Sequence, residues 1–170
     1  MAATAVKGAL AGAVAVVGDK LPWTSSDKPD AIALLETDHR RFENLLEQGV
    51  QTTERARKGR AELLRTLTAD LNLHELKEEQ VLYPALKAHS EAREIVLEGF
   101  QEHHVADMIV KELHEVATDD AQWGAKFKVL KESLEHHIKE EEGEMFRTAR
   151  AVLSHEQLRE LGARMQKLGR

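Results

Sequence analysis

The sequence predicts an all-α protein: an up-down-up-down four-helix bundle, followed by a short fifth helix and preceded by an N-terminal arm. Helix-favouring alanine, leucine, glutamate, lysine and arginine dominate the 170 residues, and glycine and proline are sparse after residue 30. Apolar residues recur every three or four positions, and no segment alternates with the period of two that a half-buried strand shows. Four long helices joined by short loops pack as a bundle of this kind.

Capping residues and apolar periodicity define the ends of the helices. The predicted ranges are about 30–48, 53–88, 90–117, 120–152 and 154–169. Ser90 is the expected N-cap of the third helix, and the run "TDD" at 118–120 caps the fourth. Ser154 and Gln157 form a capping box for the fifth helix. Pro84 should kink the second helix or mark its end. The chain then divides into an N-terminal apolar arm and linker (1–29), the bundle (30–152) and a C-terminal helix (153–170).

The N-terminal segment, 1–22, differs from the rest of the chain. The stretch "VKGALAGAVAVVG" is small and apolar, contains three glycines, and is too short to span a bilayer as a helix. We interpret it as a loosely ordered arm or short helix, joined to the bundle by the linker "LPWTSSDKPD". We expect a cytoplasmic location, with export or membrane contact through residues 1–22 as the alternative.

Composition narrows the chemistry available to the protein. A net charge of −6 argues against nucleic acid as a partner. The absence of cysteine excludes disulfides, thiolate catalysis and iron–sulfur clusters. The chain is nevertheless rich in histidine, with nine. Metal chemistry would therefore use imidazole and carboxylate ligands, which suit iron, manganese or zinc.

An internal repeat relates the two halves of the predicted bundle. "DHRRFENLL" (38–46) aligns with "EHHVADMIV" (102–110) without a gap. "HELKEEQVLYP" (74–84) aligns in the same way with "HIKEEEGEMFR" (137–147), at nearly the same offset along the chain. The first two helices therefore resemble the next two, which predicts a pseudo-twofold bundle in which equivalent residues face each other.

The phase of the histidines points six polar side chains into the core. His74 and Glu78 are four residues apart, so they share one helix face. The residues that precede His74 on this face are apolar, so the face points into the core. At the two histidine doublets, His103 and His137 follow the apolar stripe, whereas their neighbours fall on the outer faces. The inward set is His39, His74, Glu78, His103, His137 and Glu141.

A single inward histidine is ordinarily a core residue with a satisfied hydrogen bond, but a set of six would leave the core full of unpaired groups. Buried carboxylates are costly unless they are paired or bind a metal. Two carboxylates shared between two ions, with two imidazoles for each ion, would make a symmetric dinuclear site. Divalent iron suits such mixed nitrogen and oxygen ligands.

Other polar residues near this set have simpler interpretations. We interpret Asp38 and Glu102 as surface charges, with a hydrogen bond accepted from a ligand histidine as the alternative. Tyr83 and Phe146 are expected to pack in the core or at its rim, with Tyr83 beside a metal as the alternative. Residues expected on solvated faces or in loops are His89, His104, His114, His136, His155, Glu140, Glu142 and Glu144.

These motifs together resemble the hemerythrin-like, or HHE cation-binding, family over about residues 30–150. The resemblance implies a four-helix bundle with a non-haem di-iron centre that binds O2 or related species. It also implies that the six inward residues are the metal ligands. Oxygen-carrying members have a histidine where this chain has Asp107, and an aspartate at plus five where it has Glu141 at plus four. Asp107 as an extra ligand is an alternative that its phase beside Lys111 disfavours.

These departures argue against reversible O2 carriage and leave three functional hypotheses. The favoured one is a di-iron protein that binds O2, NO or peroxide in sensing or in iron, oxidative or nitrosative stress. The second is a di-iron enzyme that degrades peroxide or reduces NO. The third is a metal-free helical interaction protein. Two non-haem iron ions are the expected cofactor, ahead of manganese or zinc, and the sequence identifies no protein partner.

Overall fold

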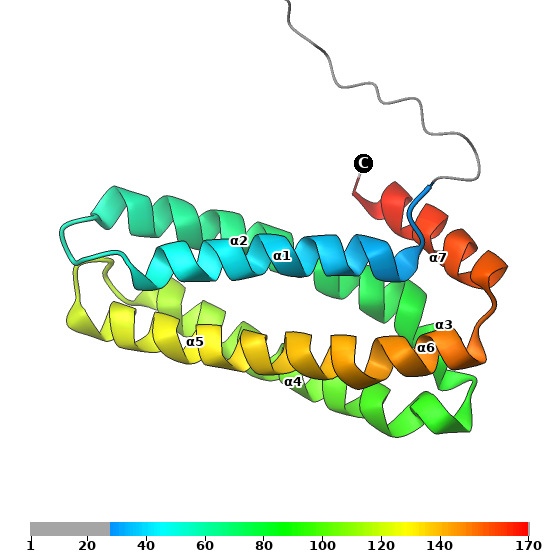
Figure 1. Cartoon of the computed structure of the whole chain (residues 1–170). Coiled ribbons are helices and arrows are strands. Elements are labelled where there is room, and N and C mark those ends of the chain that lie inside the picture. Colours follow the sequence, from blue (N-terminus) through cyan, green and yellow to red (C-terminus); the bar gives the residue numbers. More distant parts are fainter. Residues whose placement is uncertain (1–27, 170) are drawn as a thin grey trace, which may run out of the picture.

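The structure, a computed structural model, describes residues 28–169, and this part of the chain contains helices and no strand (Figure 1). The predicted all-α fold is confirmed. The long helices lie side by side as a bundle, and α7 packs across one end. The elements are α1 (Ala31–Val50), α2 (Arg57–Lys77), η1 (Glu78–Leu82), α3 (Tyr83–Lys87), η2 (Ser90–Ala92), α4 (Arg93–Glu115), α5 (Ala121–Glu140), η3 (Glu141–Met145), α6 (Phe146–Val152) and α7 (His155–Leu168).

The predicted N-terminal arm (1–22) and most of the linker lie outside the described residues. Among residues 28–169, no helix combines the length and apolarity needed to cross a membrane.

The caps predicted from the sequence form at the starts of α5 and α7 but not at the start of α4. Asp30 accepts from the Ala33 N–H at 2.9 Å, and the capping box of Ser154 and Gln157 forms at α7. The expectation that Ser90 caps the third long helix is wrong. Residues Ser90–Ala92 instead form a short 3-10 turn, the Ser90 hydroxyl bonds the carboxylate of the next residue, and α4 begins only after this turn.

Two π turns interrupt helices that the sequence predicts as continuous. In η1 the N–H of Tyr83 bonds the carbonyl of Glu78, and in η3 the N–H of Phe146 bonds the carbonyl of Glu141. Each bond reaches back five positions rather than four, which inserts one extra residue into the turn. Both turns begin at an inward glutamate, so the backbone changes its pitch where the buried polar residues lie.

Two apolar clusters fill the bundle, one toward each end. The cluster near α7 contains Leu35, Leu82, Phe146, Leu158 and Met165, among others. The cluster near the α1–α2 loop contains Leu46, Leu67, Trp123, Phe127 and Leu134, among others. Gly162 allows α7 to approach α1, because a Cβ there would lie 2.8 Å from the Pro29 carbonyl oxygen. The inward histidines lie along the chain between the residues of these two clusters.

A buried arginine ties together the two loops at the end opposite α7. Arg60 is 4% exposed and donates to the Thr52 hydroxyl at 2.9 Å and to the Thr118 carbonyl at 2.8 Å. Its guanidinium carbon also lies 4.6 Å from the ring centroid of Trp123. Since the loop before α2 and the loop before α5 share this one side chain, Arg60 fixes the relative positions of the helices they connect.

We expect Arg60→Ala to lower the free energy of unfolding by about 2–4 kcal/mol, because it removes buried hydrogen bonds and leaves their acceptors unsatisfied. Urea unfolding followed by circular dichroism measures this change. Arg65→Ala is the matched control, because Arg65 is 69% exposed and pairs only with Glu62. Equal stability of the two variants would contradict the role given to Arg60.

Candidate metal centre

The structure brings together all six side chains that the sequence points inward. They come from six different elements: His39 on α1, His74 on α2, Glu78 on η1, His103 on α4, His137 on α5 and Glu141 on η3. None of them is more than 5% exposed. Their donor atoms form two overlapping groups, with atoms of each group within 4.8 Å of one another. One group is His39, His74, Glu78 and Glu141, and the other is Glu78, His103 and His137.

The two carboxylates lie between two pairs of histidines, which we name the α1–α2 pair (His39 and His74) and the α4–α5 pair (His103 and His137). Glu78 Oε2 lies 3.3 Å from His74 Nε2 and 3.2 Å from His103 Nε2. Glu141 Oε2 lies 3.2 Å from His39 Nε2 and 3.4 Å from His137 Nε2. Each carboxylate therefore contacts one histidine from each pair, as a bridging ligand between two ions would.

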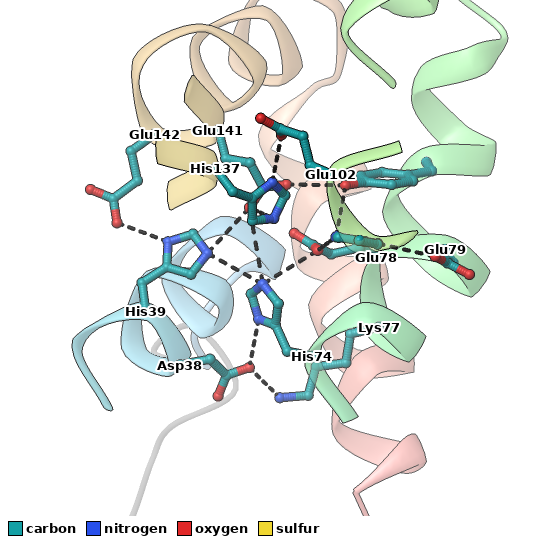
Figure 2. A network of polar contacts seen from close by, with 12 residues as sticks. Asp38, His39, His74, Lys77, Glu78, Glu79, Glu102, His137, Glu141 and Glu142 are labelled. Carbon is teal, nitrogen blue, oxygen red and sulfur yellow. Dashed lines mark hydrogen bonds and ion pairs between the residues drawn. The ribbon is translucent and has the colours of Figure 1, made fainter. Parts of the chain in front are cut away.

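Each histidine also contacts an outer carboxylate through Nδ1 (Figure 2). The four contacts are His39 to Glu142 (2.9 Å), His74 to Asp38 (3.4 Å), His103 to Glu79 (3.0 Å) and His137 to Glu102 (2.8 Å). An ionised carboxylate only accepts hydrogen bonds, so it holds the imidazole proton on Nδ1 and leaves the Nε2 lone pair facing inward. This is the tautomer that a metal ligand requires.

These contacts correct three sequence-based interpretations. Asp38 and Glu102 are not merely surface charges, and Glu142 is not simply solvated, because each accepts from an inward histidine. Asp38 and Glu102 each immediately precede an inward histidine in the sequence, and α-helical geometry turns them toward the neighbouring helix rather than straight out to solvent. The expected outward positions of His104, His136 and Asp107 agree with their exposure in the structure.

The inward atoms fit a cation and little else. Both oxygens of Glu78, Oε2 of Glu141 and Nε2 of His137 are buried without a hydrogen-bond partner. His39 Nε2 and His74 Nε2 lie 3.3 Å apart, so two lone pairs face each other once Nδ1 carries the proton. Buried acceptors without donors are costly. Cations bound to imidazole nitrogen and carboxylate oxygen would satisfy all of them at once, and this donor set suits iron, manganese or zinc.

Burial and mutual charge displace the titration of these groups in the metal-free protein. Burial, with the charge of Glu141, raises the pKa of Glu78 well above its usual value. Burial also acts to raise the pKa of Glu141, but the neighbouring histidines, His137 foremost, outweigh it and lower that pKa. Burial lowers the pKa of His74 to about 4. The site therefore does not reach a uniformly neutral or charged state without a metal.

Tyr83 adds a hydrogen-bond donor to one side of the centre. It is fully buried, and its hydroxyl donates to Glu141 Oε1 at 3.2 Å and lies 3.4 Å from His103 Nε2. Burial, with the charges of Glu78 and Glu141, raises the pKa of this phenol, so it stays protonated. Gly99 leaves the space that the Tyr83 hydroxyl occupies, because a Cβ at residue 99 would lie only 2.6 Å from that hydroxyl. The expectation of core packing for Tyr83 holds for its ring but omits its polar contact.

Glu75 is a candidate that the sequence analysis missed. It lines a small cavity together with Phe42, Leu71, His74, His103, Leu134, His137 and Ile138. Burial raises its pKa to about 7. The repeat contained a signal for this position, since Glu75 aligns with Ile138, which is buried. Glu75 is thus a further carboxylate that could bind a metal, on the cavity wall beside the α4–α5 pair.

The fold and this buried set of imidazoles and carboxylates define a helical-bundle protein with a candidate metal site. The family model of the hemerythrin HHE cation binding domain matches residues 30–149, which is more than half of the chain. The chain belongs to this family, and the resemblance inferred from its motifs is confirmed.

A solved structure shares the fold. It is the crystal structure of a hemerythrin HHE cation binding domain-containing protein, the Rv2633c homolog from Mycobacterium kansasii. The two chains are 23% identical and superpose with a TM-score of 0.71. The match covers 82% of this chain and 87% of the other chain. Comparison with curated proteins gave no match.

Glu78→Gln should stabilise the metal-free protein, with a gain that grows with pH. A carboxyl whose folded pKa is raised contributes stability that is present below its unfolded pKa and is lost as the pH rises through its folded pKa. Glutamine carries no charge, so the variant escapes this loss. Urea unfolding of the metal-free proteins should show a gap of at least about 1 kcal/mol at pH 8 that shrinks toward pH 5.

The control for this experiment is Glu132→Gln, at a glutamate on α5 that is 63% exposed. It should show no pH-dependent gap relative to the wild type. If both variants gained the same stability, the burial of Glu78 would not be the cause.

Proposed function

We propose that this protein is a non-haem di-iron protein that binds O2 or a related small species such as NO or peroxide. In this proposal His39 and His74 would hold one iron, His103 and His137 would hold the other, and Glu78 and Glu141 would serve as ligands to both. The single observation that carries the proposal is the buried set of inward lone pairs without donors. Two divalent ions match the doubling of the ligands by the repeat, and iron suits mixed nitrogen and oxygen ligands with positions open to a small molecule.

The residues around the centre have separable roles. The outer carboxylates orient the imidazoles and keep their protons on Nδ1. Phe42, Leu71 and Leu134 give the adjoining cavity an apolar wall, and the cavity has room for a water-sized molecule. When bound, the metal pair would supply open coordination and electron transfer to a small ligand. The cavity size favours a diatomic or similarly small species over an organic substrate.

Metal analysis by mass spectrometry tests this proposal first. Protein made in iron-replete medium should contain about two irons per chain, and His74→Ala should contain less, because it removes one ligand imidazole. His104→Ala is the matched control, since His104 is exposed and adjoins a proposed ligand. Absence of metal from folded wild-type protein, with unfolding indifferent to chelator, would instead support a metal-free interaction protein.

A di-iron enzyme that degrades peroxide or reduces NO is the second candidate. The observation that favours it is a pair of proton-bearing side chains beside the centre, the Tyr83 phenol and the Glu75 carboxyl on the cavity wall. They could exchange protons with a ligand, which simple binding does not require.

Turnover assays separate the two candidates. If the protein is an enzyme, Glu78→Ala and His137→Ala should abolish peroxide consumption or NO reduction, because each removes a proposed ligand. Tyr83→Phe should slow turnover while leaving the metal content unchanged. Activity that persists in Glu78→Ala and His137→Ala would refute a di-iron enzyme. A stable O2 or NO adduct with negligible turnover in the wild type would favour the binding protein.

A further inference from the structure

The two halves of the centre are related by the repeat, but the charges around them are not. The two alignments of the repeat map the outer carboxylates of the α1–α2 pair onto those of the α4–α5 pair. Two positions beside these carboxylates break the symmetry. Lys77 aligns with Glu140, and Arg40 aligns with His104. At both positions the α1–α2 side has a cation where the other side has an acid or a histidine.

Both outer carboxylates of the α1–α2 pair are neutralised by a basic side chain. Lys77 Nζ lies 2.6 Å from Asp38 Oδ2, and Lys77 is only 12% exposed (Figure 2). The Arg40 guanidinium pairs with Glu142. Arg40 is 56% exposed, so solvent screens its charge more than that of Lys77. Lys77 is thus the stronger of the two compensating charges.

The outer carboxylates of the α4–α5 pair have no such partner. No lysine or arginine within residues 28–169 lies at ion-pair distance from Glu79 or Glu102. Glu102 contacts His136 at 3.5 Å, and that imidazole is shared with Glu140 at the same distance. Negative charge therefore accumulates around the α4–α5 pair.

The charges around each pair of histidines change how strongly that position stabilises the more highly charged form of a bound ion. An outer carboxylate increases the donor strength of its imidazole, and a cation on that carboxylate reduces the effect. Excess negative charge stabilises the more highly charged ion by Coulomb attraction. Resting on the proposed di-iron function, we propose that Lys77, assisted by Arg40, makes the two positions electronically unequal. The α1–α2 position has the higher reduction potential, so the first electron given to the oxidised centre resides there and the α4–α5 position stays ferric.

Two reciprocal variants test this inequality. Lys77→Gln removes the cation beside the α1–α2 pair and should lower the higher of the two potentials. Glu140→Lys adds a cation where the repeat has its counterpart and should raise the lower potential. Both changes bring the potentials together. The measurement is a redox titration with dithionite and ferricyanide, in which the electron paramagnetic resonance signal of the half-reduced protein gives the comproportionation constant. We expect this constant to fall about tenfold in each variant.

Lys128→Gln is the control, because it makes the same chemical change at a lysine that is 72% exposed and about two and a half turns from His137. Its constant should stay within about twofold of the wild type, on the scale of a screened surface charge. Arg40→Gln removes the cation of an exposed ion pair, so it should lower the comproportionation constant less than Lys77→Gln does.

Metal analysis of every sample separates the two levels of the proposal. Iron-loaded Lys77→Gln with an unchanged or increased constant would overturn the electronic inequality and leave the di-iron function standing. Iron-free wild-type protein would overturn the di-iron function itself.

Discussion

A lone pair buried in an apolar bundle needs a positive partner, and the arrangement of this protein follows from that requirement. Six side chains direct acceptor atoms to one point between α1, α2, α4 and α5. The outer carboxylates make the problem more acute, because they hold the imidazole protons outward and remove them as internal donors. In the metal-free protein the shifted pKa values of Glu78, Glu141 and His74 compensate only in part for the missing positive charge. Cations at the centre would satisfy every inward atom together, so metal binding and the stability of the middle of the bundle are one property.

The repeat explains how a short chain builds such a site. Each half contributes a histidine preceded by an acid on one helix and an H-x-x-x-E-E run on the next. When the halves face each other, the acid before His39 reaches His74, and the acid after Glu78 reaches His103. The same pair of contacts recurs at His137 and His39 by symmetry. The aromatic positions follow the pattern as well, with Tyr83 stacked on His103 and Phe146 stacked on His39. Function can then differ between the halves through the few positions where the repeat is imperfect.

Helix phase predicted the fold and the inward set because both depend on a period that the sequence displays directly. His39 and His74 occupy positions of the apolar stripe, so their burial could be inferred residue by residue. Contacts between helices were harder to predict. The partners of Asp38 and Glu102 lie on another helix, and a single residue's phase does not report what it meets there. The π turns left no signal, since one inserted residue barely changes the apolar pattern of a long helix. Glu75 was missed for a related reason: its neighbours suggest a solvated face, and only comparison with Ile138 reveals the inward position.

The remaining architecture can be understood as support for a centre that opposes folding until it is filled. One apolar cluster joins α7 to the start of α1, and Gly162 lets these elements approach closely. The other cluster is closed by the loops that Arg60 ties together. Each cluster holds the helices together at one end of the bundle, so the polar middle does not have to supply the packing energy. This separation allows the inward groups to stay at metal-binding geometry rather than collapse onto alternative partners. The two π turns, η1 and η3, begin at Glu78 and Glu141, so the helices change pitch where these buried carboxylates lie.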